Sequence, residues 1–106
     1  MQTEKIGRKY TAVRDKNGKT VRENDIILVK FNMDFSDGEK EIQRYVKIDW
    51  DGRNERFVIN LPNGFAIVFS ESFPGIFDIE IVGNALKKSD CTFKLLDKVH
   101  HPPHLF

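Results

Sequence analysis

The side chains best suited to chemistry lie near the C-terminus of the chain. Cys91 is the only cysteine, and the three histidines are His100, His101 and His104. Nucleophilic catalysis needs a thiol or hydroxyl held beside a base, and a catalytic imidazole must be fixed to within a fraction of an ångström. The sequence HHPPH favours neither helix nor strand, because proline restricts the backbone and donates no hydrogen bond. We therefore expect no nucleophilic site and predict that the protein is not an enzyme.

The same three histidines are the residues whose spacing most resembles a metal site. Imidazoles this close together can hold a transition-metal ion weakly, but a structural zinc site needs four ligands in fixed geometry. No Asp, Glu or Cys follows them to complete such a set, and a single cysteine excludes both an intramolecular disulfide and a thiolate zinc site. We expect no cofactor and no functional metal, and leave open whether the histidine tail binds a metal ion.

Two pairs of carboxylates, Asp49 with Asp51 and Asp78 with Glu80, have the spacing of a general acid and base. Both pairs lie beside expected turns or on the polar side of an expected strand, where carboxylates are simply hydrated. The chain also lacks the glycine-rich motifs that cradle phosphate groups. These carboxylates therefore do not support a catalytic function.

A cluster of basic and aromatic residues suggests a different activity, the binding of single-stranded DNA or RNA. Small β-barrels bind single strands through aromatic rings set among cations, and Tyr45 and Trp50 are such rings. The candidate nucleic-acid contacts are Arg44, Lys47, Arg53 and Arg56. The opposing interpretation is that Trp50 packs in the core and that the cations pair with acidic neighbours. Nucleic-acid binding is kept as the alternative function.

The charge balance does not favour a nucleic-acid-binding domain. The 106 residues carry 17 Lys or Arg and 16 Asp or Glu, a net charge of +1, whereas such domains usually have a pI above roughly 9. The basic charge is concentrated in residues 1–22, so the remainder is acidic on balance. The stretch from Phe57 to Leu86 contains no Lys or Arg but holds five of the nine phenylalanines. An apolar stretch of this kind favours an interface with protein.

Short apolar runs separated by turn signals predict strands throughout the chain. The sequence DKNG over residues 15–18 predicts a tight hairpin turn, because Asn and Gly tolerate positive φ. Residues 42–50 and 57–61 alternate apolar and polar side chains, as half-buried strands do. The expected strands are 10–14, 19–21, 26–31, 42–50, 57–61, 65–69 and 77–81, with a loop over 32–39.

After residue 84 the pattern changes from strand to helix. Ser89 or Asp90 can cap a short helix that runs through Leu96. Six or seven short strands at close spacing predict an all-β fold, either a small barrel or a sandwich. We expect one domain over residues 1–106, with a core from about residue 10 to about residue 96 and a flexible tail over 100–106.

The interior of a small barrel accepts only about every second residue of each strand, so part of the phenylalanine-rich stretch must lie outside. Alternation predicts an inner set of Phe57, Ile59, Phe65, Ile67, Phe69, Phe77, Ile79 and Ile81. The rest lies either beneath the C-terminal helix, against Phe93, Leu95 and Leu96, or at a protein interface. The candidate interface residues are Val58, Val68, Phe73 and Ile76. Edge strands of an open barrel would add backbone pairing to self-association.

Two segments, read together, resemble the YopX family of phage and prophage proteins. The first, DKNGKTVRENDIILV over residues 15–29, resembles that family's opening turn and the strand that follows. The second, IEIVGNALKKSDCTFKLL over residues 79–96, resembles its closing strand, Gly-Asn pair and short segment ending in Leu-Leu. Asn24 stands where the family usually has Gly, and residues 85–87 replace bulkier ones. The resemblance implies a small SH3-like β-barrel, here of about six strands, and it implies no known catalytic residues.

Composition and resemblance together predict where and how the protein acts. The start MQTEKIGRKY has no apolar signal segment, and no apolar run is long enough for a membrane span. We therefore expect the cytoplasm of the host cell and no membrane. We predict a non-catalytic, phage- or prophage-encoded accessory protein that binds protein, as a homo-oligomer or with a host or phage partner, in host takeover or counter-defence.

Overall fold

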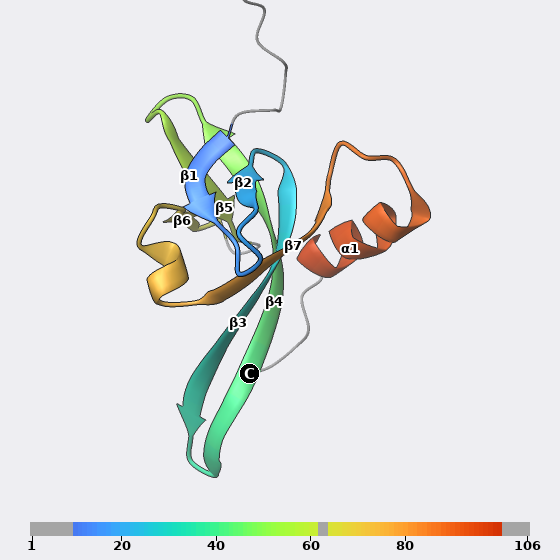
Figure 1. Ribbon diagram of the computed structural model, residues 1–106. Helices are drawn as coiled ribbons and strands as arrows, with labels where there is room; N and C mark the ends of the chain where they lie inside the picture. The colour runs from blue at the N-terminus through green and yellow to red at the C-terminus, as the bar shows by residue number, and fades with distance from the viewer. Residues whose placement is uncertain (1–9, 62–63, 101–106) are drawn as a thin grey trace, which may run out of the picture.

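The computed structural model describes residues 10–61 and 64–100, and most of this part of the chain is β structure (Figure 1). Seven strands, one 3-10 turn and one α-helix occur in these residues. Their bounds are β1 Tyr10–Arg14, β2 Thr20–Arg22, β3 Asp25–Phe35, β4 Gly38–Asp51, β5 Arg56–Asn60, β6 Ala66–Val68, η1 Phe73–Gly75, β7 Asp78–Asn84 and α1 Asp90–His100. The prediction of a mostly β fold with a short C-terminal helix is confirmed.

The strands form two antiparallel sheets. β1 and β2 make a hairpin, and the other five strands make a sheet in the order β6-β5-β4-β3-β7. Within residues 10–61 and 64–100, β6 and β7 lie at opposite edges of this sheet and do not pair with each other. The sheet is therefore open, and the predicted SH3-like β-barrel is not confirmed.

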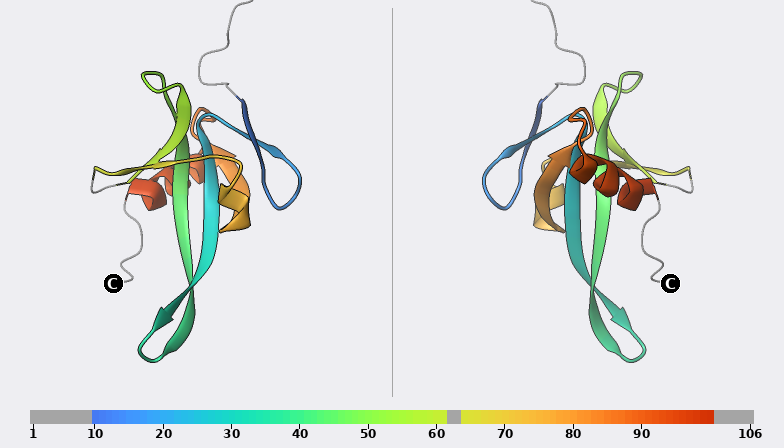
Figure 2. Two further views of the ribbon diagram at one scale, coloured as in Figure 1. Left: turned by 90° about the vertical axis from the view of Figure 1, so that its left-hand side faces the viewer. Right: turned by 90° about the vertical axis from the view of Figure 1, so that its right-hand side faces the viewer.

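β3 and β4 form a hairpin that extends well beyond the rest of the sheet (Figures 1 and 2). Their pairing continues without interruption to Phe35, which lies opposite Gly38. The predicted loop over 32–39 is wrong, because the polar residues there pair with each other across a ribbon and show no apolar alternation. At the tip, Lys40 forms an ion pair with Asp37 at 3.1 Å and lies over the Phe35 ring.

One face of the five-stranded sheet carries the main core. The β1–β2 hairpin and η1 fold over this face, so side chains from both sheets meet in one buried cluster. The cluster contains Val13, Val21, Ile27, Val29, Ile48, Ile59, Phe69, Phe73 and Ile79. The ring of Phe73 lies 5.0 Å from that of Phe69 and 4.6 Å from that of Phe77, measured between centroids. Burial of these apolar side chains is the main favourable contribution to folding.

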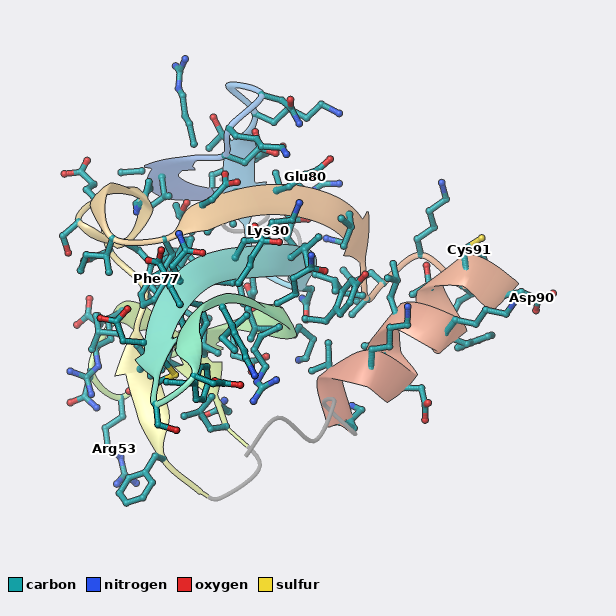
Figure 3. All side chains as sticks on the ribbon, turned by 90° about the horizontal axis from the view of Figure 1, so that it is seen from below. Lys30, Arg53, Phe77, Glu80, Asp90 and Cys91 are labelled. Atoms are coloured by element: carbon teal, nitrogen blue, oxygen red, sulfur yellow. The ribbon has the colours of Figure 1, made fainter. Side chains whose placement is uncertain are left out.

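The opposite face of the sheet is partly covered by α1 (Figure 2). Ser89 caps the helix, since its Oγ accepts a backbone hydrogen bond from the first turn at 3.1 Å. Leu95 packs against Gly83, where a Cβ atom would lie only 3.0 Å from Leu95 Cδ1. The helix continues past its predicted end to His100. It lies on the side of the sheet away from the β1–β2 hairpin, and its Asp90 end projects outward (Figure 3).

Asp15 fastens the β1–β2 turn to the outer edge of β7. One carboxylate oxygen accepts hydrogen bonds from the backbone N–H groups of Asn17 and Lys19, each at 2.9 Å. The other oxygen accepts one from Ile81 N at 3.0 Å, and the N–H of the next turn residue donates to Ile79 O at 3.0 Å. Burial raises the pKa of Asp15, but the three backbone donors outweigh it and hold the pKa below its usual value.

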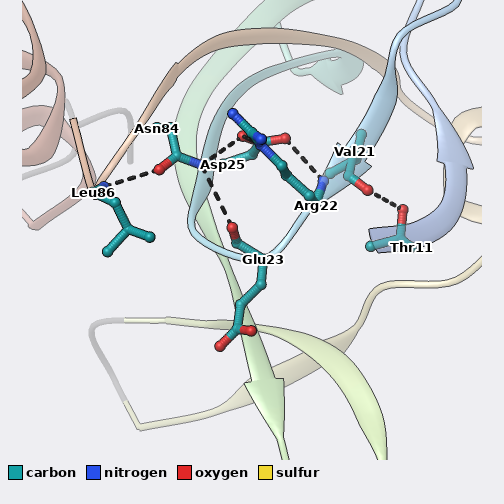
Figure 4. Close-up of polar contacts among 7 residues, drawn as sticks. All are labelled: Thr11, Val21, Arg22, Glu23, Asp25, Asn84 and Leu86. Carbon is teal, nitrogen blue, oxygen red and sulfur yellow. Dashed lines mark hydrogen bonds and ion pairs between the residues drawn. The ribbon is translucent and has the colours of Figure 1, made fainter. Parts of the chain in front are cut away.

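A second polar cluster joins the β2–β3 turn to the end of β7 (Figure 4). Asp25 accepts hydrogen bonds from Arg22 N at 2.9 Å and from the side-chain amide of Asn84 at 2.8 Å. Asn24 adopts a φ of 71°, which Asn tolerates better than most residues, and its carbonyl accepts a hydrogen bond from Ala85 N at 2.8 Å. Residues 15–29 and 79–96 therefore contact each other at both polar clusters.

We predict that Asp15→Asn lowers the free energy of unfolding by about 1–3 kcal/mol, the usual loss when a buried polar group is left unsatisfied. An amide has one acceptor oxygen where the carboxylate has two, so either the turn or Ile81 N loses its partner. Because the native pKa is lowered, the contribution of Asp15 is present above the unfolded pKa and lost as the pH falls through the native pKa. Urea unfolding should give a lower free energy of unfolding for the variant than for wild type at neutral pH. This difference in free energy should become smaller well below pH 3.8. Equal stability at neutral pH would contradict this prediction.

Candidate functional site

The chemically active side chains do not come together in the described part of the chain. Cys91 is exposed beside Asp90 at the outer end of α1 (Figure 3). His100 is the last residue of that helix and is exposed, whereas His101, His104 and the rest of the expected tail lie outside the described residues. Among residues 10–61 and 64–100, no group of three or more His, Cys, Asp or Glu could hold a metal ion. A functional site has to be sought on other surfaces.

A polar cleft of about 430 Å³ lies between the sheet and the C-terminal end of α1. On its floor Lys47 pairs with Asp49, whose other oxygen accepts a hydrogen bond from the Asn60 side chain at 2.9 Å. Its remaining lining consists of Leu61, Val99 and His100. Because Lys47 and Asp49 neutralise each other, the cleft floor presents no net charge that would select a charged ligand.

The four candidate nucleic-acid contacts do not lie on one surface. Arg44 and Lys47 are on opposite faces of β4, since side chains an odd number of residues apart on a strand point to opposite sides. Arg53 is exposed in the turn between β4 and β5 (Figure 3). Arg56 begins β5, where its Nε lies 3.6 Å from Asp51 Oδ2. These four cations therefore do not form the continuous basic surface on which a phosphate backbone would lie.

Two of the four candidate interface residues are buried. Val58 is only 5% exposed and Phe73 only 7%. Val58 lies in β5, an inner strand between β4 and β6, and Phe73 turns back through η1 onto neighbouring rings of the core. The prediction that both lie partly outside is wrong, because strand alternation does not hold through a 3-10 turn or on a strand covered on both faces. Val68 and Ile76 are at the surface, 44% and 69% exposed.

The apolar surface that alternation failed to reveal lies along β6. Phe65 and Ile67 are 70% and 43% exposed, although both were expected inside. They remain outside because β6 is an edge strand, and within the described residues it pairs with β5 alone. We refer to Phe65, Ala66, Ile67 and Val68 as the β6 edge. The sequence signal for it is the uncharged run FAIVF over residues 65–69.

The backbone of the β6 edge directs hydrogen-bonding groups outward. The carbonyl of Phe65 and the N–H of Phe69 both bond to the segment that contains β5, at 2.8 and 2.9 Å. In an antiparallel pair, every second residue bonds to the same neighbour. Ala66 and Val68 therefore direct their N–H and C=O groups away from β5. The left-hand view of Figure 2 shows no other described element in front of this strand.

An open apolar groove adjoins the end of the β6 edge, with a volume of about 290 Å³. Its lining consists of Thr11, Ala12, Val13, Arg56, Phe57, Val68, Phe69, Ser70 and Glu71. These residues come from β1, from β5, and from the end of β6 and the chain that follows it. The groove marks the seam along which β1 and β6 lie near each other without pairing, as far as the described residues show.

The opposite edge of the sheet is protected. The Asp15 turn engages Ile79 O and Ile81 N on the outer side of β7, and Asp78 and Glu80 place negative charge on that strand. Charged residues and covering loops are the usual means by which proteins prevent edge-to-edge association. Residues 65–69 carry no charge, and within residues 10–61 and 64–100 no strand pairs with the outer side of β6, so the two edges of one sheet differ in what they can bind.

Comparison with known proteins adds no assignment. No protein family, curated protein or solved structure matches the chain. Within residues 10–61 and 64–100, no helix combines the length and apolar character needed to cross a membrane. The β6 edge and its groove must therefore be judged from their own geometry.

We predict that Phe73→Ala lowers the free energy of unfolding by about 3–5 kcal/mol, as expected when a buried aromatic side chain is truncated. Ile76 lies in the same segment and is 69% exposed, so Ile76→Ala is the matched control and should change stability by less than about 0.5 kcal/mol. Denaturant unfolding measures both effects. A Phe73→Ala variant as stable as wild type would contradict its assignment to the core.

Proposed function

We propose that this protein is a non-catalytic binding protein that takes an extended polypeptide segment as an added strand on the β6 edge. The observation that carries the proposal is an exposed, uncharged edge strand whose Ala66 and Val68 direct their backbone groups outward. In strand addition, main-chain hydrogen bonds supply affinity and alternate side chains supply selectivity. An uncharged edge favours a partner segment that is itself uncharged and rich in β-branched or aromatic residues.

The groove beside β6 would supply the selectivity. A strand added to β6 places every second side chain on the core side of the sheet, the side that carries Phe57 and Phe69 in the groove wall. An apolar side chain there would remove its own surface and that of the wall from water, which favours binding by roughly 25 cal/mol for each Å² of apolar surface buried. A charged side chain at the same position would lose its hydration without gaining a partner.

We further propose that the fold is an opened SH3-like barrel. Support comes from the five-stranded sheet with the β1–β2 hairpin across one face. In such an arrangement, pairing along the seam between β1 and β6 would complete the barrel. A strand bound at β6 would then occupy the side on which the barrel is left open.

The setting we propose is that of a YopX-like accessory protein of a phage or prophage, acting in the host cytoplasm in host takeover or counter-defence. The support is the resemblance of two sequence segments. Those segments meet where Asp15 contacts Ile81 and where Asp25 contacts Asn84. The two segments that carry the resemblance therefore hold the fold together. The proposed function depends on a different part of the molecule, the β6 edge. The partner would be a host protein, a phage protein or a second copy.

Selection from a random peptide library against the immobilised protein tests strand addition at β6. We expect the enriched peptides to be uncharged, to alternate apolar residues, and to bind Ile67→Lys at least about tenfold more weakly, because the variant places a charge on the edge. Leu86→Lys is the matched control, since Leu86 lies away from β6 and is exposed to nearly the same extent, 41% against 43%. Fluorescence anisotropy with labelled peptides measures the affinities.

The rival function, binding of single-stranded DNA or RNA, leads to a different result. Labelled oligonucleotides would bind at about 50 mM salt and lose affinity steeply as the salt rises. The double variant Arg53→Ala, Arg56→Ala would weaken that binding, and Ile67→Lys would leave it unchanged. This pattern, with no peptide enriched, would overturn the proposed function.

A further inference from the structure

We infer that the strand added to the β6 edge is β6 of a second copy of this chain. The inference rests on the proposed function and names its partner. The two copies would pair antiparallel about a twofold axis at Ile67, and Phe65 of each copy would enter the groove of the other. The inference rests on two features at opposite ends of β6, the exposed ring of Phe65 at one end and an apolar groove at the other.

Twofold pairing about Ile67 matches the directions of the backbone groups in β6. In this register Ala66 of one copy lies opposite Val68 of the other, and these are the residues that direct their N–H and C=O groups outward. Each of the two Ala66–Val68 pairs would exchange two hydrogen bonds, as alternate pairs do in antiparallel sheets. In a register displaced by one residue, residues whose backbone groups point away from β5 would lie opposite residues whose backbone groups point toward β5. These residues could not exchange hydrogen bonds, so that register is excluded.

The side chains of β6 are compatible with this pairing. Ile67 lies at the axis, in a pair without hydrogen bonds, where two Cα atoms approach to about 4.5 Å. Residues 65–69 carry no charge, so the twofold arrangement sets no like charges against each other. Ile67 and Val68, now 43% and 44% exposed, would both lose contact with water.

The groove provides a second contact in the same register. Phe65 of one copy lies opposite Phe69 of the other, and Phe69 is part of the wall of the 290 Å³ groove. The two rings belong to the same side of the sheet, because strand residues separated by an even number face the same way. Phe65 is 70% exposed in the single chain, and an apolar recess in the second copy would bury it.

A second copy of the chain would cover both the exposed Phe65 ring and the apolar groove, whereas an unrelated strand would cover only the groove. In the twofold arrangement the ring and the groove are each used twice, so neither Phe65 nor the groove is left in water. An unrelated segment would fill the groove but leave Phe65 exposed. The association stops at two copies, because the Asp15 turn already covers the other edge of the sheet.

Analytical ultracentrifugation of the full chain tests the twofold pairing. We expect a dimer at micromolar concentration for wild type and for the control Leu86→Lys. Ile67→Lys should raise the dissociation constant at least about a hundredfold, because it sets two like charges together at the axis. Phe65→Ala should raise it about tenfold or more, because it removes the aromatic anchor from the groove. Circular dichroism of each variant verifies that the chain remains folded.

Disulfide crosslinking tests the register. In a Cys91→Ser background, Ile67→Cys places two thiols across the axis with their Cα atoms about 4.5 Å apart, within the range of about 4.4–6.8 Å that disulfides require. Mild oxidation with copper phenanthroline should convert most of this variant to a covalent dimer. Ala66→Cys and Leu86→Cys should remain largely uncrosslinked, because neither residue lies opposite its own counterpart.

A wild-type monomer, or a dimer that neither Ile67→Lys nor Phe65→Ala weakens, would overturn the inference. Crosslinking through Leu86→Cys in preference to Ile67→Cys would overturn it as well. The proposed function would survive either result if uncharged peptides still bind wild type and fail to bind Ile67→Lys. Loss of both dimerisation and peptide binding would remove the proposed function too.

Discussion

The carboxylate of Asp15 joins two parts of the chain that are far apart in sequence, and much of the architecture depends on that contact. It accepts backbone hydrogen bonds from its own turn and from Ile81 in β7. The β1–β2 hairpin is thereby held across one face of the sheet, where Val13 and Val21 complete the core. A burial penalty on the charge is outweighed by three backbone donors, so the contact is strongest when the carboxyl is ionised.

Because the hairpin turn covers β7, one edge of the five-stranded sheet is covered and the other edge is accessible. At the β7 edge Ile79 O and Ile81 N are bonded to the hairpin turn, and the strand carries Asp78 and Glu80. The β6 edge has exposed apolar side chains, outward backbone groups and an adjoining groove. In an open sheet both edge strands need protection, since unpaired edge strands promote association with other chains. In our proposal this protein covers one edge with its own turn and the other with a bound strand.

Local sequence signals predicted much of the fold. The first strand has the predicted bounds, Tyr10–Arg14, the DKNG turn follows it, and Ser89 caps the helix as one of two expected residues. The loop predicted over 32–39 is a ribbon, because its polar residues pair across the two strands and need no apolar face. The groove wall and the polar cleft could not be predicted, since each combines residues from separate elements.

The sequence by itself determined the β class, the positions of most turns and the uncharged run that became the β6 edge. These properties depend on backbone preferences and on the alternation of apolar and polar side chains between near neighbours, so short segments of sequence are enough to predict them. Which apolar residues face water was decided only by the tertiary structure. Val58 and Phe73 are buried and Phe65 and Ile67 exposed, the reverse of the expected arrangement, because burial depends on the order of strands in the sheet and on the way η1 turns Phe73 onto the core. The position of the β1–β2 hairpin over the sheet likewise depends on the contact of Asp15 with Ile81, two residues that lie far apart in the sequence.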